Sequence, residues 1–286
     1  MNPFPEVKKN FGFGMMRLPM IGDKVDMDAT KDMVDAFIAA GFNYFDTAHP
    51  YLGGQSEDAV NICISSRYPR EAFLLADKLS GGCFETEEEI LPLFQKQLEK
   101  CGVEYFDFYL MHAMSAGRHE KYTQTRAYDI AFELKAQGKI RHVGMSFHDS
   151  ARVLDRILTE RPEIEVVQLQ LNYVDWDDPK VQSRKCYDIC RKHGKPVIIM
   201  EPLRGGKLVN NLPEEAKKWM QKHPAGYSPA QWALRWLWNQ KEVTVVLSGM
   251  NSEEMVNENI RVASETRVGE LTQEDMALYA AVIKAI

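Results

Sequence analysis

Short apolar runs alternate with longer amphipathic segments along almost the whole chain, and this order limits the folds that the chain can adopt. Eight runs rich in aromatic and branched residues are strand candidates, and the segments between them carry apolar positions at helical spacing. The candidates are 11–14 and the runs that end at Asp46, Lys78, His112, Ser146, Asn172, Glu201 and Gly249. This order predicts an α/β fold, and eight such units favour a (β/α)8 TIM barrel.

The amphipathic segments are predicted helices that cross from one strand to the next. They span 28–40, 56–65, 85–100, 125–137, 151–160, 179–193, 229–240 and 252–263. A glycine that can end a helix follows four of them, at Gly41, Gly102, Gly138 and Gly194. A doubly wound sheet would show the same alternation, because local pattern does not show whether a sheet closes. No linker-like stretch interrupts the chain, so we interpret 1–286 as a single domain.

Composition argues against several classes of partner. The chain has 286 residues and a formal net charge of −6, and its basic residues lie scattered among acidic ones, which argues against nucleic acid. No signal-like or membrane-spanning apolar stretch is present, so we expect a cytoplasmic protein without a membrane partner. The five cysteines form no Cys-x-x-Cys pair and are expected to be reduced. Cys186 and Cys190 lie four apart, but buried structural cysteines explain them better than a metal site.

Several predicted strands end in a polar residue that is costly to bury alone. In a parallel barrel these ends open onto one face. Asp46 ends one strand, Tyr51 follows five residues later, and Lys78 and His112 end the next two strands. An ammonium beside a tyrosine lowers the tyrosine pKa, and a carboxylate keeps that ammonium charged and in place. Each residue alone has an ordinary structural explanation, whereas the set predicts a proton-transfer site without a metal.

These motifs resemble those of the aldo-keto reductase superfamily. The matching segments are DTAHPY at 46–51, ADK at 76–78, FDFYLMH at 106–112, GKIRHVGMS at 138–146, VVQLQLN at 166–172, EPLRGG at 201–206 and SGMNSEEMVNEN at 248–259. The resemblance covers nearly the whole chain, and four catalytic-type positions occur in order at barrel spacing. It implies a barrel that binds a nicotinamide dinucleotide, NADP(H) or NAD(H), across the C-terminal mouth.

The same resemblance implies a role for each matching residue. Tyr51 would be the general acid, Asp46 and Lys78 its tuning pair, and His112 the donor that orients the substrate carbonyl. The residues implied for the cofactor are Gly14 and Met15 beside it, Ser146 and Gln168 at the carboxamide, Pro202, Leu203, Gly205 and Lys207 at the pyrophosphate, and Ser252, Glu258 and Asn259 at the adenosine end. Backbone N–H groups with little side-chain bulk suit a pyrophosphate, and the LRGG segment at 203–206 offers them.

The chain departs from the family pattern at positions that affect cofactor binding. Met200 stands where many relatives have a tyrosine that stacks on the nicotinamide. Gly249 and Met255 stand where the family has basic residues for the adenosine 2′-phosphate, which leaves NADPH and NADH both open. Arg261 is the nearby charge that would compensate.

One subgroup is more similar than the superfamily at large. The segments 53–57, 144–150, 171–176 and 200–208 resemble bacterial reductases that often carry a C-terminal ferredoxin-like segment. Residues 1–286 contain no such cysteine cluster, so an iron–sulfur cluster or electron partner would depend on a segment outside this chain.

We therefore expect an oxidoreductase that reduces an aldehyde or ketone to an alcohol. The alternative of the same fold is a catalytically weak, cofactor-binding regulatory or redox-sensing subunit. A metal-dependent hydrolase would need several strand-end ligands that the sequence does not supply. The substrate is expected to meet the loop segments at 114–124 and 174–179 and the C-terminal segment. Tyr173 and Trp176 would form an apolar or stacking wall, and Arg118 or His119 would meet an acidic group.

Overall fold

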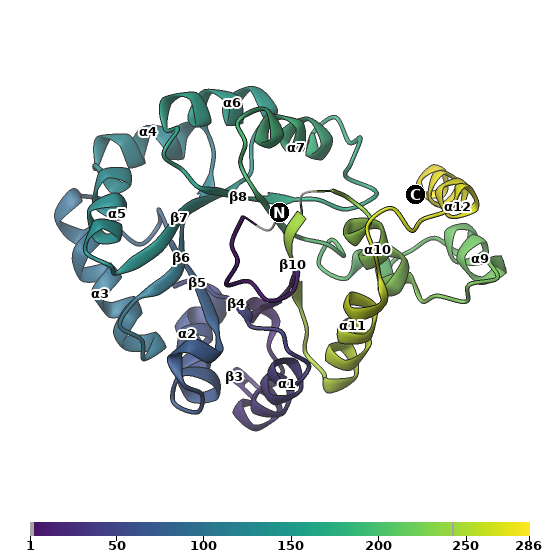
Figure 1. The fold of residues 1–286 in the computed structure, drawn as a ribbon, viewed down its shortest axis with the longest axis horizontal. Coiled ribbons are helices and arrows are strands. Elements are labelled where there is room, and N and C mark those ends of the chain that lie inside the picture. The colour runs from purple at the N-terminus through teal and green to yellow at the C-terminus, as the bar shows by residue number, and fades with distance from the viewer. Residues whose placement is uncertain (1–2, 242) are drawn as a thin grey trace.

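The computed structural model describes residues 3–241 and 243–286 and contains a closed parallel barrel (Figure 1). Its strands are β1 (Phe11–Gly14), β4 (Tyr44–Asp46), β5 (Leu74–Leu79), β6 (Phe106–Met114), β7 (Ile140–Phe147), β8 (Val166–Gln170), β9 (Val197–Met200) and β10 (Val243–Gly249). Each strand pairs in parallel with its neighbours, and β1 closes the ring against β10, with Gly14 opposite Gly249. The prediction of a (β/α)8 barrel is therefore confirmed, and a doubly wound sheet is excluded.

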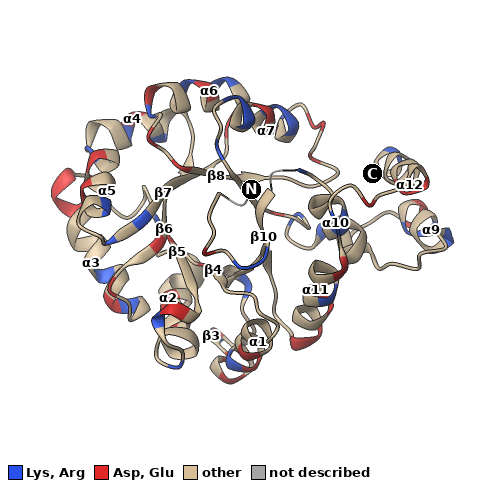
Figure 2. Cartoon of the chain, in the orientation of Figure 1, with Lys and Arg blue, Asp and Glu red and all other residues tan. Residues whose placement is uncertain are grey.

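The helices form a layer around the barrel (Figure 1). They are α1 (Met27–Ala39), α2 (Gln55–Val60), α3 (Ile90–Cys101), α4 (Ala116–Gln124), α5 (Ala127–Ala136), α6 (Ala151–Glu160), α7 (Ser183–Lys192), α8 (Lys207–Asn210), α9 (Glu214–Lys222), α10 (Pro229–Trp238), α11 (Glu253–Glu265) and α12 (Gln273–Ala285). A short antiparallel hairpin, β2 (Met20–Ile21) with β3 (Lys24–Val25), follows β1. Figure 2 shows acidic and basic residues interspersed along the outer helices. Within the described ranges, no helix has the length and apolar character needed to span a bilayer.

Apolar side chains fill the barrel interior and close its N-terminal end. Phe4, Phe108, Leu110 and Ile198 belong to one buried cluster inside the ring of strands. The Phe4 ring contacts the Phe108 ring edge-on, with 5.1 Å between centroids, so the segment before β1 closes the N-terminal end of the barrel. This closure leaves the C-terminal mouth as the face where a site can form.

The four predicted helix-ending glycines all have positive φ, which confirms them as terminators. At Gly102, which ends α3 with a φ of 65°, an added Cβ would also lie 2.7 Å from Asn61 Oδ1. Both the backbone conformation and the close packing therefore require glycine there.

Element boundaries differ from the sequence predictions at several places. The 114–124 segment, expected to be a loop, contains α4, because Ser115 caps the helix and His119 and Tyr122 bury one of its faces. Helix α7 begins at Ser183 rather than at 179, since the Asp178 carboxylate accepts hydrogen bonds from the Lys180 and Val181 backbone N–H groups and holds a turn. The predicted helix at 56–65 becomes α2 followed by a π-helical turn over Asn61–Ser65.

Candidate active site

Asp46 and Lys78 form a buried ion pair at the C-terminal mouth of the barrel. Asp46 ends β4, and Lys78 lies on β5, the next strand in the ring. Lys78 Nζ donates to Asp46 Oδ1 and to the Thr47 carbonyl oxygen, each at 2.6 Å. The Lys78 side chain is fully buried, so its charge is balanced by these oxygens rather than by water.

Tyr51 lies against the Lys78 ammonium. The chain turns sharply after Tyr51, because Leu52, Gly53 and Gly54 all adopt positive φ. This turn places Lys78 Nζ 4.7 Å from the centroid of the Tyr51 ring. The sequence prediction that Tyr51, Lys78 and Asp46 meet at one point agrees with this geometry.

Burial and charge have opposite effects on these two groups. Burial raises the pKa of Tyr51 above its ordinary value, and the Lys78 ammonium offsets only part of that rise. Burial alone would lower the pKa of Lys78, but the Asp46 carboxylate and Tyr51 outweigh it and raise the pKa to about 12. Tyr51 is therefore a neutral acid beside a permanent cation, and the expectation that its pKa would be lowered overall is wrong because burial dominates.

His112 lies beside Tyr51 at the mouth. It lies on β6, and its ring meets the Tyr51 ring edge-on with 5.8 Å between centroids. Burial, with smaller contributions from the charges of Lys78, Arg118 and His148, lowers the pKa of His112 to about 3. The imidazole is consequently neutral at physiological pH and can donate one hydrogen bond.

Ser80 holds the His112 ring in place, and the sequence interpretation missed it. Ser80 Oγ lies 2.6 Å from His112 Nδ1. When the hydroxyl donates to Nδ1, the imidazole proton resides on Nε2, which is then the donor for a ligand. The available signal was spacing, since residues two apart at the end of a strand share one face, and Ser80 follows Lys78 by two.

Ser146 and Gln168 lie side by side on β7 and β8, and both are buried. Gln168 Nε2 donates to Asp46 Oδ2 at 3.0 Å, so Gln168 completes the shell around the carboxylate that binds Lys78. Ser146 Oγ accepts from the Ala113 backbone N–H at 2.7 Å, immediately after His112. The two residues expected at a nicotinamide carboxamide are thus tied to the catalytic candidates by hydrogen bonds.

The segment after β9 provides an unusual stretch of backbone at the mouth. Glu201, Arg204, Gly205 and Gly206 all have positive φ. Gly205 and Lys207 are exposed, whereas Pro202 is buried and Met200 and Leu203 are half-buried. Gly205 adds no side-chain bulk to this exposed stretch of backbone, which is compatible with the predicted pyrophosphate contact.

Arg17 joins this region, although no pattern in the sequence pointed to it. Its aliphatic part covers Gly249, where an added Cβ would lie 3.1 Å from Arg17 Cδ. Its guanidinium reaches Gly205, where an added Cβ would lie 2.9 Å from Nη2, and is 3.8 Å from Glu201 Oε1. A cation from the turn after β1 therefore stands next to Gly249, where the family pattern has a basic side chain. Pairing of β1 with β10 brings it there.

The other residues expected along the cofactor have structural partners. Gly14 pairs with Gly249 in the barrel, and Met15 is fully buried, with its side chain in the core and its carbonyl oxygen accepting from Ser56 Oγ at 3.0 Å. On α11, Ser252 caps the helix and Glu258 accepts from Ser228 Oγ at 2.8 Å. Asn259 is buried and donates to Ser248 Oγ at 3.2 Å. Met255 and Arg261, on the same helix, are exposed.

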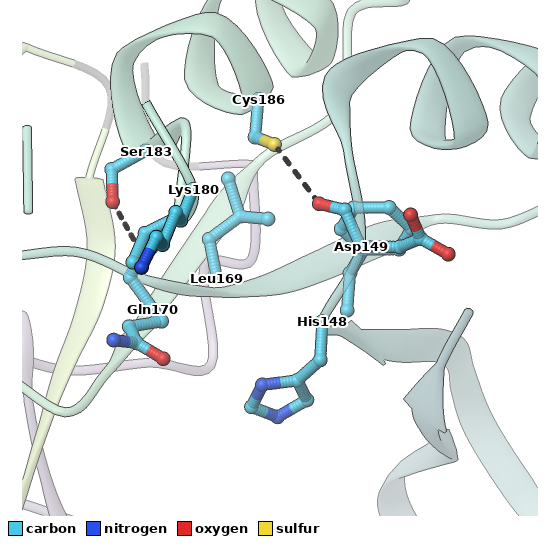
Figure 3. Close-up of a pocket in the computed structure, with 9 residues that line it drawn as sticks. His148, Asp149, Leu169, Gln170, Lys180, Ser183 and Cys186 are labelled. Carbon is cyan, nitrogen blue, oxygen red and sulfur yellow. Dashed lines mark hydrogen bonds between the residues drawn. The ribbon is translucent and has the colours of Figure 1, made fainter. Parts of the chain in front are cut away.

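A cavity of about 220 Å³ lies beside the mouth, between the ends of β7 and β8 and the start of α7. Figure 3 shows the His148 ring and the Gln170 amide on one side of it, with Cys186 on the other. Ser183 Oγ donates to the Gln170 carbonyl oxygen at 2.8 Å, and Cys186 Sγ donates to the Asp149 carbonyl oxygen at 3.9 Å (Figure 3). All five cysteines are free thiols, and Cys186 and Cys190 are buried.

A second polar cluster lies behind the strand that carries Lys78. One ligand-type atom from each of Glu57, Asp77 and Cys101 lies within 4.8 Å of the others, and no other group of this kind occurs in the described ranges. His49 Nδ1 lies 2.8 Å from Glu57 Oε2. Burial raises the pKa of Glu57 to about 7, and burial together with Glu57 raises the pKa of Asp77 well above its ordinary value. Both carboxyl groups are therefore harder to ionise than ordinary carboxyl groups.

The structure separates the four residues that were expected to meet a substrate. Tyr173 is buried against Tyr279, so its part in the predicted apolar wall is wrong. Trp176 packs against Tyr187 and Trp236 and is half-buried. His119 is buried between Tyr128 and Glu160 and is not free to meet a ligand. Arg118 is exposed at the mouth, where its Nη1 donates to the carbonyl oxygen of Ala113 at 2.6 Å.

A parallel barrel with a lysine–carboxylate pair, a tyrosine and a neutral imidazole at its C-terminal mouth defines a barrel enzyme equipped for proton transfer. Residues 10–284 match the model of the Aldo/keto reductase family, and the chain belongs to that family.

Similar proteins agree with this assignment. The chain is 28% identical over 268 residues to a glyoxal reductase of Bacillus subtilis, covering 93% of this chain and 86% of the relative. It is 24% identical over 263 residues to an NADH-specific methylglyoxal reductase of Escherichia coli, covering 77% of this chain and 78% of the relative. Among solved structures, an aldo/keto reductase of Klebsiella pneumoniae in complex with NADP and acetate shares the fold, with a TM-score of 0.77, 19% identity and coverage of 97% and 92%.

Proposed function

We propose that this protein reduces an aldehyde or ketone to an alcohol with NADH or NADPH and that Tyr51 is the general acid. The observation that carries the proposal is the Lys78 ammonium, which is fixed at 2.6 Å from Asp46 and lies against the Tyr51 ring. Family membership supports oxidoreductase chemistry. A neutral tyrosine beside a permanent cation suits proton donation, because the cation stabilises the tyrosinate that remains.

The bound dihydronicotinamide would supply hydride to the carbonyl carbon. Tyr51 Oη would transfer its proton to the carbonyl oxygen as that oxygen gains the electron pair of the C=O bond. His112 Nε2 would donate a hydrogen bond to the same oxygen, with Ser80 fixing the ring. Tyrosinate at Tyr51, stabilised by Lys78, would then recover a proton from solvent after the alcohol forms.

The cofactor assignments belong to the same proposal. Ser146 and Gln168 would contact the carboxamide, and the backbone from Pro202 to Gly205, with Lys207, would contact the pyrophosphate. We add Arg17 to this set, since its ion pair with Glu201 is long, its aliphatic part covers Gly249 and its guanidinium reaches Gly205. Gly14, Met15 and Met200 would line the nicotinamide end. On α11, Ser252, Glu258 and Asn259 would hold the adenosine end.

The names of the relatives suggest small aldehydes as a first panel of substrates. The two relatives described above are a glyoxal reductase and an NADH-specific methylglyoxal reductase. Gly249 and the exposed Met255 offer no cation of their own to a 2′-phosphate, while Arg17 lies beside Gly249, so the proposal includes both NADH and NADPH.

The decisive experiment compares wild type with Tyr51→Phe. We expect kcat for aldehyde reduction to fall by about 100- to 10,000-fold, because the acid is removed while the ring remains. Titration of both proteins with NADH and NADPH, followed by nicotinamide fluorescence, should give similar dissociation constants. Wild-type turnover by Tyr51→Phe would show that another group is the acid. Cofactor binding without turnover of any aldehyde by wild type would favour the regulatory alternative.

A further inference from the structure

Arg118 places a positive charge on the rim next to His112. It lies in the first turn of α4, and its Nη1 donates to the carbonyl oxygen of Ala113 at 2.6 Å. Ala113 directly follows His112, and its φ of 54° turns the chain at this point. The guanidinium is thus anchored to the backbone of the residue that follows the carbonyl-orienting histidine.

This charge has no acidic partner, unlike most arginines in the described part of the chain. Arg70, for example, pairs with Asp107 at 2.6 Å, and Arg235 pairs with Glu270 at 2.7 Å. Arg118 forms no ion pair within the ranges that the structure describes, and the Ala113 carbonyl uses only one of its N–H groups. Its remaining donors are exposed to solvent and are available to a ligand.

The neighbouring carboxylate of Asp149 does not neutralise Arg118. Asp149 faces the start of α4 and accepts from the backbone N–H groups of Ala116 at 2.9 Å and Ser150 at 2.6 Å. These two bonds hold the carboxylate at the chain turn rather than against the guanidinium.

The other titratable neighbours also leave the charge of Arg118 uncompensated. The loop that follows β7 carries His148 alongside, because the His148 backbone N–H donates to the Met114 carbonyl oxygen at 2.9 Å. Burial and the charge of Arg118 lower the pKa of His148, so that ring is neutral. On the inner wall, the Lys78 charge is taken up by Asp46.

We propose that Arg118 binds a carboxylate on the substrate, so that the preferred substrates are aldehydes or ketones that carry an acidic group. This inference rests on the proposed carbonyl reductase function. A guanidinium presents paired N–H donors that match the two oxygens of a carboxylate, which an ammonium does not. Anchoring at Ala113 reduces the freedom that the side chain must lose on binding.

The test uses two matched pairs of aldehydes that differ in charge and span two lengths. The first pair is 4-carboxybenzaldehyde and methyl 4-formylbenzoate, and the second is succinic semialdehyde and its methyl ester. For wild type, we expect kcat/KM for the acid to exceed that for the ester by about 10- to 100-fold in at least one pair, the range of one charge-assisted contact. Arg118→Gln should remove this preference through a higher KM for the acid, and ester turnover should not change. Arg118→Lys should restore it in part.

Arg152 provides the matched control. It is exposed in the first turn of α6 and forms no ion pair in the described ranges, so Arg152→Gln removes the same charge from a neighbouring helix. The acid preference should survive this change. If Arg152→Gln lost the acid preference to the same extent as Arg118→Gln, the inference would be overturned. The preference would then come from long-range attraction by the positive charge of this region and not from a contact with Arg118.

The ester separates failure of the inference from failure of the proposed function. Ester turnover without any acid preference in either pair would overturn only the role of Arg118. Absence of turnover for both acid and ester by wild type, with NADH and with NADPH, would overturn the proposed function and this inference with it.

Discussion

The two sides of the barrel mouth are built differently. On the side of β4 to β8, the polar side chains form hydrogen bonds with one another. Asp46 accepts from Lys78 Nζ at 2.6 Å and from Gln168 Nε2 at 3.0 Å, and Ser80 Oγ lies 2.6 Å from His112 Nδ1. On the side of β9 and β10, Arg17 lies 3.8 Å from Glu201 and the neighbouring backbone has positive φ at several positions. Short hydrogen bonds therefore fix the side chains on the side of β4 to β8. On the side of β9 and β10, a charged side chain and backbone groups are exposed.

This difference matches the two tasks that we propose for the mouth. Groups that stabilise charge in a transition state work best when they are already oriented. A segment that admits and releases a large anionic cofactor must be able to change its contacts. We therefore expect substitutions on the first side to change kcat and substitutions on the second to change the KM of the cofactor.

Lys78→Met should produce the largest effect among the substitutions that test this division. It removes the cation that stabilises tyrosinate and leaves Asp46 without its main partner, so kcat should fall by at least about 100-fold. The measurement is steady-state reduction of an aldehyde that wild type turns over, together with a cofactor titration and a thermal melt. Lys218→Met, which removes an exposed lysine on α9, is the control and should match wild type. A Lys78→Met variant that keeps wild-type kcat would contradict the division between the two sides.

Arg17→Met should raise the KM of the cofactor by about tenfold and leave kcat within about twofold, since it removes a cation from the side with adaptable contacts. Arg261→Met tests the cation that the sequence suggested instead, and it should have little effect because Arg17, and not Arg261, lies against Gly205 and Gly249. The comparison requires both KM values, for NADH and for NADPH. Loss of kcat in Arg17→Met without a change in KM would place Arg17 with the catalytic groups.

The smallest expected effect is the dependence of kcat on pH that arises from Tyr51 and His112, on the side of β4 to β8. Burial lowers the pKa of His112 to about 3, so His112 stays neutral above roughly pH 5. Burial raises the pKa of Tyr51 above its ordinary value, so Tyr51 keeps its proton up to roughly pH 9. The plot of kcat for reduction should therefore be level between about pH 5 and about pH 9. A break near pH 6.5 that disappears in a His112 variant would show that this ring is more exposed during turnover.

The sequence alone predicted those features of the site that follow from the positions of residues at the ends of barrel strands. Asp46, Lys78 and His112 lie at or near the ends of consecutive strands, and closure of any parallel barrel brings such positions together. Local turn residues likewise identified the helix ends at Gly41 and Gly102.

Local sequence pattern did not predict the features that depend on packing between distant segments. Arg17 reaches Gly249 only because β1 and β10 pair across the closure of the ring. Trp176 looked like an exposed loop aromatic, yet Tyr187 on α7 and Trp236 on α10 pack against it. The fall in Tyr51 pKa expected from Lys78 was reversed by burial, a quantity that the sequence does not contain.

The carboxyl pair of Glu57 and Asp77 links folding of this chain to proton uptake. An unfolded chain holds both groups ionised at neutral pH, whereas burial in the folded state raises the pKa of Glu57 to about 7 and raises the pKa of Asp77 well above its ordinary value. Raised carboxyl pKa values make the folded state bind more protons than the unfolded state, so this pair stabilises the fold less as pH rises through neutrality. The heat of unfolding should accordingly depend on the ionisation enthalpy of the buffer, which receives the proton when the barrel opens.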